Sequence, residues 1–424
     1  MNIRQFAFFV FASLALCLLF QRESSQASPA ATAGDNPRLG PEIVISALQN
    51  SQYAPAVAYN SQHDEYLVVW HNTWPGPSRE VWGSRVSSQG AVIDSFKLGT
   101  AVSANDHSLA SVAYDPTRDR YLVVWIYDYY GNGSDWDLHG RFIPWNGPNA
   151  SLTEFVINGY TSDQWDPQVV YATFQDEFLV TWTNIQTTAP ASIIARRVAA
   201  DGSGFPAGPF TVASHATQVR VNPSLAYSNF RNEYLVTFDN GFDIFGVRLR
   251  PDGTIFPGGE FTIAGWPDAE TYPAVASCPG WDQYLVLWHS LTTNGDYDIF
   301  ARFLSGGGSA GAVWTVHNWI IDEQHPAVAC SANGRRYLVA WEQQDSNFIT
   351  GIWGRTIDTA AAMTTAIEIV SAGTNANRAR PALAGGTPGS LVVWEHAREG
   401  TAFIDIHGKL FWPHALYLPL ILRP

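Results

Sequence analysis

The hydrophobic positions of this chain recur in a fixed order. The apolar stretch "YLVVW" at residues 66–70 returns, with small changes, at intervals of 50 to 57 residues. Both alternating faces of each copy are apolar, which predicts a strand buried between two neighbouring layers and not a strand with one wet face. The seven copies occupy residues 66–70, 121–125, 178–182, 234–238, 284–288, 337–341 and 390–394.

Further apolar stretches flank each copy. A stretch such as "PAVAY" at residues 55–59 precedes it, and a short polar link joins the two, as in a β-hairpin. A third stretch such as "DIFGVRL" at residues 243–249 follows, always with Gly or Ala in its middle. We interpret this small residue as a site of close packing against the next unit. A fourth stretch such as "EFTIA" at residues 260–264 closes six of the seven units.

The missing fourth stretch lies at the other end of the chain. "EIVIS" at residues 42–46 precedes the first repeat and is nearly identical to "IEIVS" at residues 367–371. The pattern therefore predicts an all-β fold, a seven-bladed β-propeller with four antiparallel strands per blade. The N-terminal strand should complete the last blade and close the ring. In this arrangement the repeated Trp residues form the core and not a ligand cage.

The repeat resembles that of secreted bacterial propellers built from the pattern "P-x-V-A-Y … Y-L-V-V-W … D-I-x-G-x-R-V". The resemblance covers residues 41–411. Because most of these relatives have no assigned function, the resemblance implies the architecture and carries over no catalytic residues. The Ser-x-Asp-x-Gly-x-Thr-Trp box of sialidases is absent from the sequence.

Both ends of the chain have a composition unlike that of the repeats. Arg4 precedes an apolar run at residues 6–20, and small residues end at Ala27, which predicts a signal peptide at residues 1–27. Acylation at Cys17 and an uncleaved anchor are the alternatives. A flexible leader at residues 28–40, the propeller at residues 41–411 and an apolar tail at residues 412–424 should follow.

Composition and charge narrow the choice of partners. The chain has 24 Lys and Arg against 38 Asp and Glu, a net charge of −14, so a nucleic-acid partner is not expected. No segment of the mature chain is long and apolar enough to span a membrane. We expect a secreted or cell-surface monomer that recognises a glycan or an extracellular protein.

The mature chain holds two cysteines, Cys278 and Cys330, once Cys17 leaves with the signal peptide. They follow the first strands of adjacent blades with a one-residue offset, which turns their side chains toward opposite faces. Neighbouring blades present such faces to each other. The sequence leaves two alternatives, a disulfide between these blades or two buried thiols.

The residues before each inner strand are expected to line the central channel and to bind a ligand. They vary while the scaffold repeats, which indicates one asymmetric pocket on the face that carries the longer loops. Their mixture of rings, amides and charges suits a neutral sugar or a peptide. The candidates are Tyr53, His107, Trp165, Asp166, Asn222, Tyr272, His325 and Arg380.

The sequence predicts no cofactor and no metal site. Its histidines are scattered singly and form no zinc-binding motif. The acidic loop between Asp128 and Asp137 contains glycines but lacks the regular spacing and the closing Glu of an EF-hand. A calcium ion in that loop is a minor alternative.

The sequence favours a noncatalytic binding or scaffold protein over an enzyme. The alternative is a glycan-cleaving enzyme, a hydrolase or a lyase, whose carboxylates meet at the propeller axis. A cluster of carboxylates at the axis would favour the enzyme, whereas an aromatic shelf would favour the binder. The candidate carboxylates are Asp166, Asp268, Glu270, Asp322 and Glu323.

Overall fold

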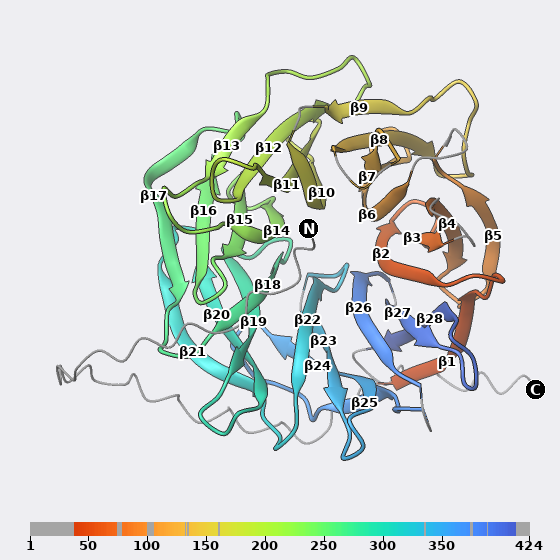
Figure 1. The fold of residues 1–424 in the computed structure, drawn as a ribbon, viewed down its shortest axis with the longest axis vertical. Helices are drawn as coiled ribbons and strands as arrows, with labels where there is room; N and C mark the ends of the chain where they lie inside the picture. The colour runs from red at the N-terminus through yellow and green to blue at the C-terminus, as the bar shows by residue number, and fades with distance from the viewer. Residues whose placement is uncertain are drawn as a thin grey trace, which may run out of the picture.

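The chain folds into seven four-stranded antiparallel sheets set around a central axis, as Figure 1 shows. The predicted seven-bladed propeller is therefore confirmed. The computed structural model describes residues 38–73, 79–99, 106–131, 133, 135–159, 162–334, 336–373, 376–387 and 389–412. The predicted signal peptide, most of the leader and residues 413–424 of the tail lie outside these ranges. None of the described residues belongs to a helix with the length and apolarity to cross a membrane.

In every blade the first strand lies nearest the axis, and the following strands are added outward (Figure 1). Blades 1 to 3 consist of β2 (Gln52–Asn60), β3 (Glu65–Thr73), β4 (Arg79–Ser87), β5 (Val92–Lys97), β6 (His107–Asp115), β7 (Arg120–Asp128), β8 (Trp136–Pro144), β9 (Phe155–Asn158), β10 (Asp163–Ala172), β11 (Glu177–Ile185), β12 (Ser192–Ala199) and β13 (Phe210–Ala213). Blades 4 to 6 consist of β14 (Val221–Ser228), β15 (Glu233–Asp239), β16 (Ile244–Leu249), β17 (Ile255–Ala264), β18 (Glu270–Ser277), β19 (Gln283–Leu291), β20 (Tyr297–Ser305), β21 (Ala310–His317), β22 (Glu323–Cys330), β23 (Arg336–Gln344), β24 (Thr350–Asp358) and β25 (Ile367–Val370).

Blade 7 combines the two ends of the described chain. It contains β26 (Arg378–Gly385), β27 (Ser390–Ala397) and β28 (Ile404–Trp412), and β1 (Arg38–Ser46) supplies its outer strand. β1 runs antiparallel to β28, with Glu42 opposite Lys409 and Ser46 opposite Ile406. The N-terminal strand thus closes the ring as predicted, and it begins at Arg38, ahead of the boundary expected at residue 41.

The second strand of each blade supplies the core aromatic residue. Six tryptophans and Phe238 occupy equivalent positions, and all seven side chains are fully buried. Burial of each such side chain contributes about 2–3 kcal/mol, so the aromatic ladder is a major stabiliser of the ring. The tryptophans are Trp70, Trp125, Trp182, Trp288, Trp341 and Trp394.

The hairpin between the first two strands explains the Asp or Asn before many copies of the repeat. Asp64 adopts φ of 54° and accepts a hydrogen bond from Tyr59 Oη at 2.6 Å. The left-handed conformation suits Asp and Asn, whose short polar side chains tolerate it. Blades 2 to 4 repeat the contact in the pairs Tyr114–Asp119, Tyr171–Asp176 and Tyr227–Asn232.

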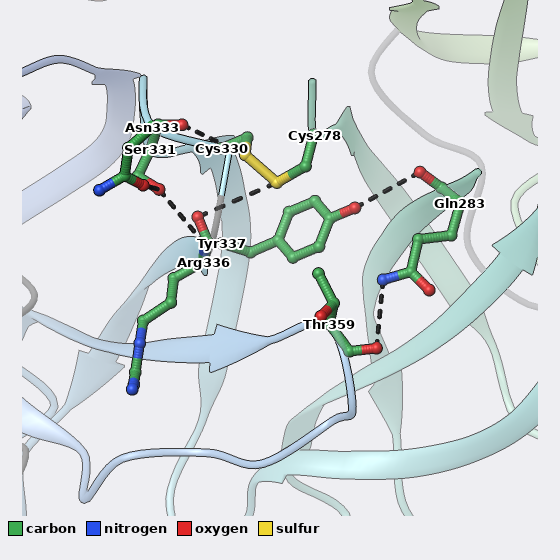
Figure 2. Close-up of a disulfide and its surroundings, with 8 residues drawn as sticks. All are labelled: Cys278, Gln283, Cys330, Ser331, Asn333, Arg336, Tyr337 and Thr359. Atoms are coloured by element: carbon green, nitrogen blue, oxygen red, sulfur yellow. Dashed lines mark hydrogen bonds between the residues drawn. A yellow bond between two sulfur atoms is a disulfide. The ribbon is translucent and has the colours of Figure 1, made fainter. Parts of the chain in front are cut away.

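A disulfide joins blades 5 and 6 near the hairpin between the first two strands, where blades 1 to 4 have the tyrosine contact, as Figure 2 shows. Cys330 holds the position of Tyr59 in its own blade, and Cys278 comes just after β18. Of the two alternatives that the sequence left open, the structure contains the Cys278–Cys330 disulfide. The ring of Tyr337 lies beside it and donates from Oη to the backbone oxygen of Gln283 at 3.4 Å.

The structure shows what the small residue in the middle of the third strand packs against, and this differs from the prediction. A Cβ at Gly140 would lie 2.8 Å from Ile157 of β9, and one at Gly354 would lie 2.8 Å from Ile369 of β25. The space is therefore taken by the fourth strand of the same blade, and the predicted packing against the next unit is wrong. The physical reason is that bulky β-branched residues of the short outer strand lean over the third strand.

Candidate functional site

The inner strand of every blade carries a bulge at the residue before its proline or, in blade 2, before Ala110. These residues have φ between 49° and 54°, and the pairing with the second strand skips at each of them. The inner strand is an edge strand, where proline is tolerated because its missing N–H is not needed by a further strand. The bulged residues are Ala54, Leu109, Asp166, Asn222, Tyr272, His325 and Arg380.

The seven bulged residues line one cavity on the axis, with a volume of about 700 Å³. The residues that follow each of them in the inner strand complete its wall. A volume of this size falls within the range of small-molecule sites in proteins. Each bulge thus interrupts the pairing of the inner strand with the second strand and turns one side chain toward the axis. Each of the seven blades contributes one such side chain.

Six of the eight predicted ligand-binding residues line this cavity: Trp165, Asp166, Asn222, Tyr272, His325 and Arg380. The expected placement of Tyr53 and His107 is wrong. The Tyr53 ring stacks on His71, with 5.6 Å between centroids, and His107 is buried beside Tyr127. The bulge shifts the register, so blades 1 and 2 present Ala54 and Leu109 instead.

A second ring of side chains supports the bulged backbone from behind. In blades 4 to 7 it is formed by the residue after the ladder aromatic, and the sequence interpretation missed it. Glu342 Oε1 accepts the N–H of Arg380 at 2.6 Å, and Glu395 Oε1 accepts that of Ala54 at 2.8 Å. The N–H of His325 donates to His289 Nδ1 at 3.2 Å. Each contact joins one blade to the next, so these side chains fix both the bulge and the blade interface.

Asp239 fills the same role between blades 4 and 5. Its Oδ2 accepts the N–H of Tyr272 at 3.0 Å and Nδ2 of Asn222 at 2.9 Å, and Oδ1 accepts the N–H of Gly241 at 3.0 Å. Its side chain is fully buried. Burial raises the pKa of Asp239 to about 6 in spite of these three donors.

The ionisable residues of the cavity wall are held by this second ring. His325 Nδ1 lies 3.0 Å from Glu342 Oε1, and Arg380 Nε lies 3.6 Å from Glu395 Oε1. Tyr272 packs edge to face on His325, with ring centroids 4.9 Å apart. The two carboxylates therefore lie within ion-pair distance of the imidazole and the guanidinium, although His325 Nδ1 makes no hydrogen bond. Tyr272, 46% exposed, remains open to the cavity.

Asp166 is the one carboxylate among the residues that line the cavity. Burial raises its pKa, and the positive charge of Arg380 opposes that shift. Blades 3 to 7 therefore present Asp166, Asn222, Tyr272, His325 and Arg380, whereas blades 1 and 2 present apolar side chains. The wall therefore has a polar side and an apolar side.

Three of the other four candidate carboxylates have structural roles. Glu270 and Glu323 are fully buried and accept the N–H groups of Trp266 and Trp319, respectively. Asp322 accepts the N–H of Tyr297 at 3.0 Å. Neither these residues nor Asp268 line the axial cavity. Only Asp166 remains as a carboxylate that could face a ligand there.

The acidic loop after β7 is organised by its own backbone. Asp128 accepts hydrogen bonds from the N–H groups of Gly131 and Gly133, at 2.9 and 2.6 Å. Among the described residues of this loop, no three carboxylate or imidazole donors come together. A calcium ion there stays a prediction.

A second cavity, of about 500 Å³, lies beside blade 3 on the side of the links from β9 to β10 and from β11 to β12. Amide and hydroxyl groups form much of its wall, together with Phe210. The wall holds no ionisable side chain among the described residues. This cavity offers hydrogen bonds but no group for proton transfer.

Comparison with known proteins is informative at the level of the fold. No protein-family model matches this chain, and no curated protein matches it in sequence. The crystal structure of polysaccharide lyase Uly1 aligns over 88% of this chain and 99% of its own, with 8% identity and a TM-score of 0.55. The GH93 α-L-arabinofuranosidase of Fusarium graminearum, in complex with arabinobiose, aligns over 77% of this chain and 99% of its own, with 10% identity and a TM-score of 0.53.

A third similar structure is the K499G mutant of NanB sialidase from Streptococcus pneumoniae. It aligns over 88% of this chain and 70% of its own, with 8% identity and a TM-score of 0.50. Identities this low show a shared propeller architecture and do not carry catalytic residues across. The resemblance to secreted bacterial repeat propellers therefore holds for the fold, and its finer part stays a prediction.

Proposed function

We propose that this protein is a glycan-cleaving enzyme that hydrolyses a neutral glycan in the axial cavity. The observation that carries the proposal is the one-sided wall, where a carboxylate, a carboxylate-backed imidazole, a guanidinium and an exposed ring face one space. The similar structures named as a lyase and as an arabinofuranosidase support a glycan-directed role for this architecture. The proposal reverses the preference for a noncatalytic binder drawn from the sequence.

The charge around the cavity favours a neutral substrate. Asp239, Glu342 and Glu395 lie directly behind the wall, and Arg380 is the one guanidinium among the lining residues. An acidic surrounding repels an anionic polysaccharide. A neutral glycan cannot undergo the elimination that a uronic acid permits, so hydrolysis is the reaction that fits the site.

The proposed chemistry uses two proton-transfer groups. Asp166, whose pKa is raised by burial, gives a proton to the glycosidic oxygen as the bond from that oxygen to the anomeric carbon breaks. His325, whose Nδ1 lies 3.0 Å from Glu342 Oε1, takes a proton from the water whose oxygen bonds to the anomeric carbon. Tyr272 stacks against the apolar face of a sugar ring, and Arg380 donates hydrogen bonds to its hydroxyls.

The test is hydrolysis of a panel of neutral glycans by the mature protein, followed by the same assay on variants. Asp166→Asn and His325→Gln should each lower the rate by about 100-fold or more. Asp268→Asn is the matched control, because Asp268 does not line the cavity, and it should keep the wild-type rate. Equal rates for wild type and Asp166→Asn would contradict the assignment.

A noncatalytic glycan-binding propeller is the second candidate. Asp239 is fully buried, and Glu342 and Glu395 accept hydrogen bonds from backbone N–H groups. Asp166 therefore has no second carboxylate beside it that is free to contact a ligand, which favours this candidate. Binding of a glycan without any release of reducing ends would support this candidate over the enzyme.

The cell surface or the extracellular space is the proposed location. The predicted signal peptide at residues 1–27 and the Cys278–Cys330 disulfide both support export, because disulfides persist in oxidising compartments. We also propose that the protein acts as a monomer, since the closed ring leaves no blade edge that requires a partner.

A further inference from the structure

Three side chains that donate to metals meet in the outer half of blade 7. Glu42 comes from β1, His396 from β27 and His407 from β28. Their donor atoms all lie within 4.8 Å of one another, and no other group of three such donors occurs among the described residues. The chain ends thus bring together residues that are more than 350 positions apart in the sequence.

The geometry of this group differs from an ordinary hydrogen-bonded pair. Glu42 Oε1 lies 2.6 Å from His407 Nδ1 and 3.2 Å from His396 Nδ1. The two imidazole rings stack with 3.7 Å between centroids, and both Nδ1 atoms lie near the same carboxylate oxygen. His407 makes a hydrogen bond there, whereas the buried Nδ1 of His396 makes none. A buried nitrogen without a partner is costly, and a bound ion would satisfy it.

Blade 2 shows which part of the group is specific to blade 7. His139 Nδ1 lies 2.6 Å from Glu154 Oε1 there, and the two residues hold the positions of His407 and Glu42. The position of His396, two residues after the ladder tryptophan, is taken by Tyr127 in blade 2. His107 Nε2 also lies 3.7 Å from Glu154 Oε1 in blade 2. The Glu–His pair is therefore a repeated contact with a further histidine nearby, and among the described residues only blade 7 brings all three donor atoms within 4.8 Å of one another.

We propose that Glu42, His396 and His407 bind one zinc ion that fastens the N-terminal closure strand to β27 and β28. Two imidazoles and a carboxylate form a donor set that suits zinc and does not suit calcium or magnesium, and water would supply the fourth ligand. Donors at about 2.0–2.2 Å from zinc lie about 3.3–3.6 Å apart. Zinc binding therefore requires Glu42 Oε1 to move away from His407 Nδ1. It also requires the stacked rings to turn apart, because zinc lies in the plane of each imidazole that binds it.

The direct test is calorimetric titration of zinc chloride into the mature, tag-free protein after removal of metals by a chelator. We expect one zinc per chain for the wild type and for His139→Ala, the matched control in blade 2. His396→Ala should weaken binding at least tenfold. Absence of binding to the wild type, or equal binding by the wild type and His396→Ala, would overturn the proposal.

His396→Ala is the decisive variant because it leaves the His407–Glu42 hydrogen bond in place. His407→Ala removes that bond as well and could loosen β1 without any metal. Each variant is therefore compared with itself in the presence and absence of zinc, after its near-ultraviolet circular dichroism has shown an intact tryptophan ladder.

Amide hydrogen exchange locates the effect of the ion. Zinc should slow exchange in residues 38–46 of the wild type and leave β13 of blade 3 unchanged. The same addition should have no effect on residues 38–46 of His396→Ala. Zinc bound to the wild type with no change in residues 38–46 would contradict the fastening role. None of these readouts depends on glycan hydrolysis, so the proposal can fail or succeed independently of the proposed function.

Discussion

The carboxylate of Glu395 accepts a hydrogen bond from the backbone N–H of Ala54, with 2.8 Å between Oε1 and N. Glu395 lies in the last blade and Ala54 in the first, so this bond closes the ring at the axis. The pairing of β1 with β28 closes it at the rim. One closure thus lies on the axial side of blade 7 and the other on its outer side. The axial closure also forms part of the candidate site.

Removal of the axial contact should weaken the fold. Glu395→Ala leaves the N–H of Ala54 buried without an acceptor, and we expect a loss of about 1–3 kcal/mol in the free energy of unfolding. Glu395→Gln keeps an acceptor and should lose less. Urea denaturation measures both, with the exposed Glu368→Ala as control. An equal stability of Glu395→Ala and the control would refute this role.

Where the small residue of the third strand is glycine, its replacement by alanine should destabilise the fold. A Cβ at Gly354 would lie 2.7 Å from Val339 O and 2.8 Å from Ile369 Cδ1, so Gly354→Ala should cost about 1–3 kcal/mol. Gly208→Ala is the control, because nothing lies within 4 Å of a Cβ there. Thermal unfolding midpoints compare the two, and a tolerated Gly354→Ala would contradict the packing argument.

Loss of the disulfide should destabilise blades 5 and 6. The bond between Cys278 and Cys330 spans a sequence separation of 52 residues, and its removal in the double Ala variant should cost about 2–5 kcal/mol. Addition of a reductant should lower the denaturation midpoint of the wild type toward that of the variant. A wild type insensitive to reductant under unfolding conditions would argue that the bond does not form.

Glu323 should make stability depend on pH. Burial, with a further contribution from Asp298, raises its pKa to about 9 in the folded chain, against 4.5 for the ordinary group. Between these two values the folded chain holds a proton that the unfolded chain has lost, so stability falls as pH rises across this window. Glu323→Gln cannot titrate, and its denaturation midpoint should vary less between pH 5 and 9. Parallel curves for the two proteins would count against the buried, protonated Glu323.

The fold was predictable because its signals are local and repeated. The residues at 66–70 and their six copies show two apolar faces, and the displaced stretch at 42–46 shows how the ring closes. Most of the axial wall was predictable for the same reason, since a proline marks the bulge in blades 3 to 7. In blade 1 Pro55 marks Ala54 in the same way, so the prediction of Tyr53 was wrong by one residue. Blade 2 has Ala110 in place of proline, so its sequence did not indicate that Leu109 lies at the bulge.

The second ring was not predicted, because its residues look like ordinary strand positions. Asp239, His289, Glu342 and Glu395 each follow the ladder aromatic, and an alignment of the repeats at that aromatic would have placed them in one column. The zinc-binding group gave no sequence signal at all. Glu42 and His407 lie at opposite ends of the propeller sequence, and only ring closure brings them together.

The measurement that tests the axial site most directly is a crystal structure of Asp166→Asn soaked with an oligosaccharide that the wild type cleaves. We predict a sugar ring in the axial cavity, stacked on Tyr272 and within hydrogen-bond distance of Arg380, with its glycosidic oxygen facing residue 166. An oligosaccharide bound instead in the cavity beside blade 3, with the axial cavity filled only by water, would contradict the account.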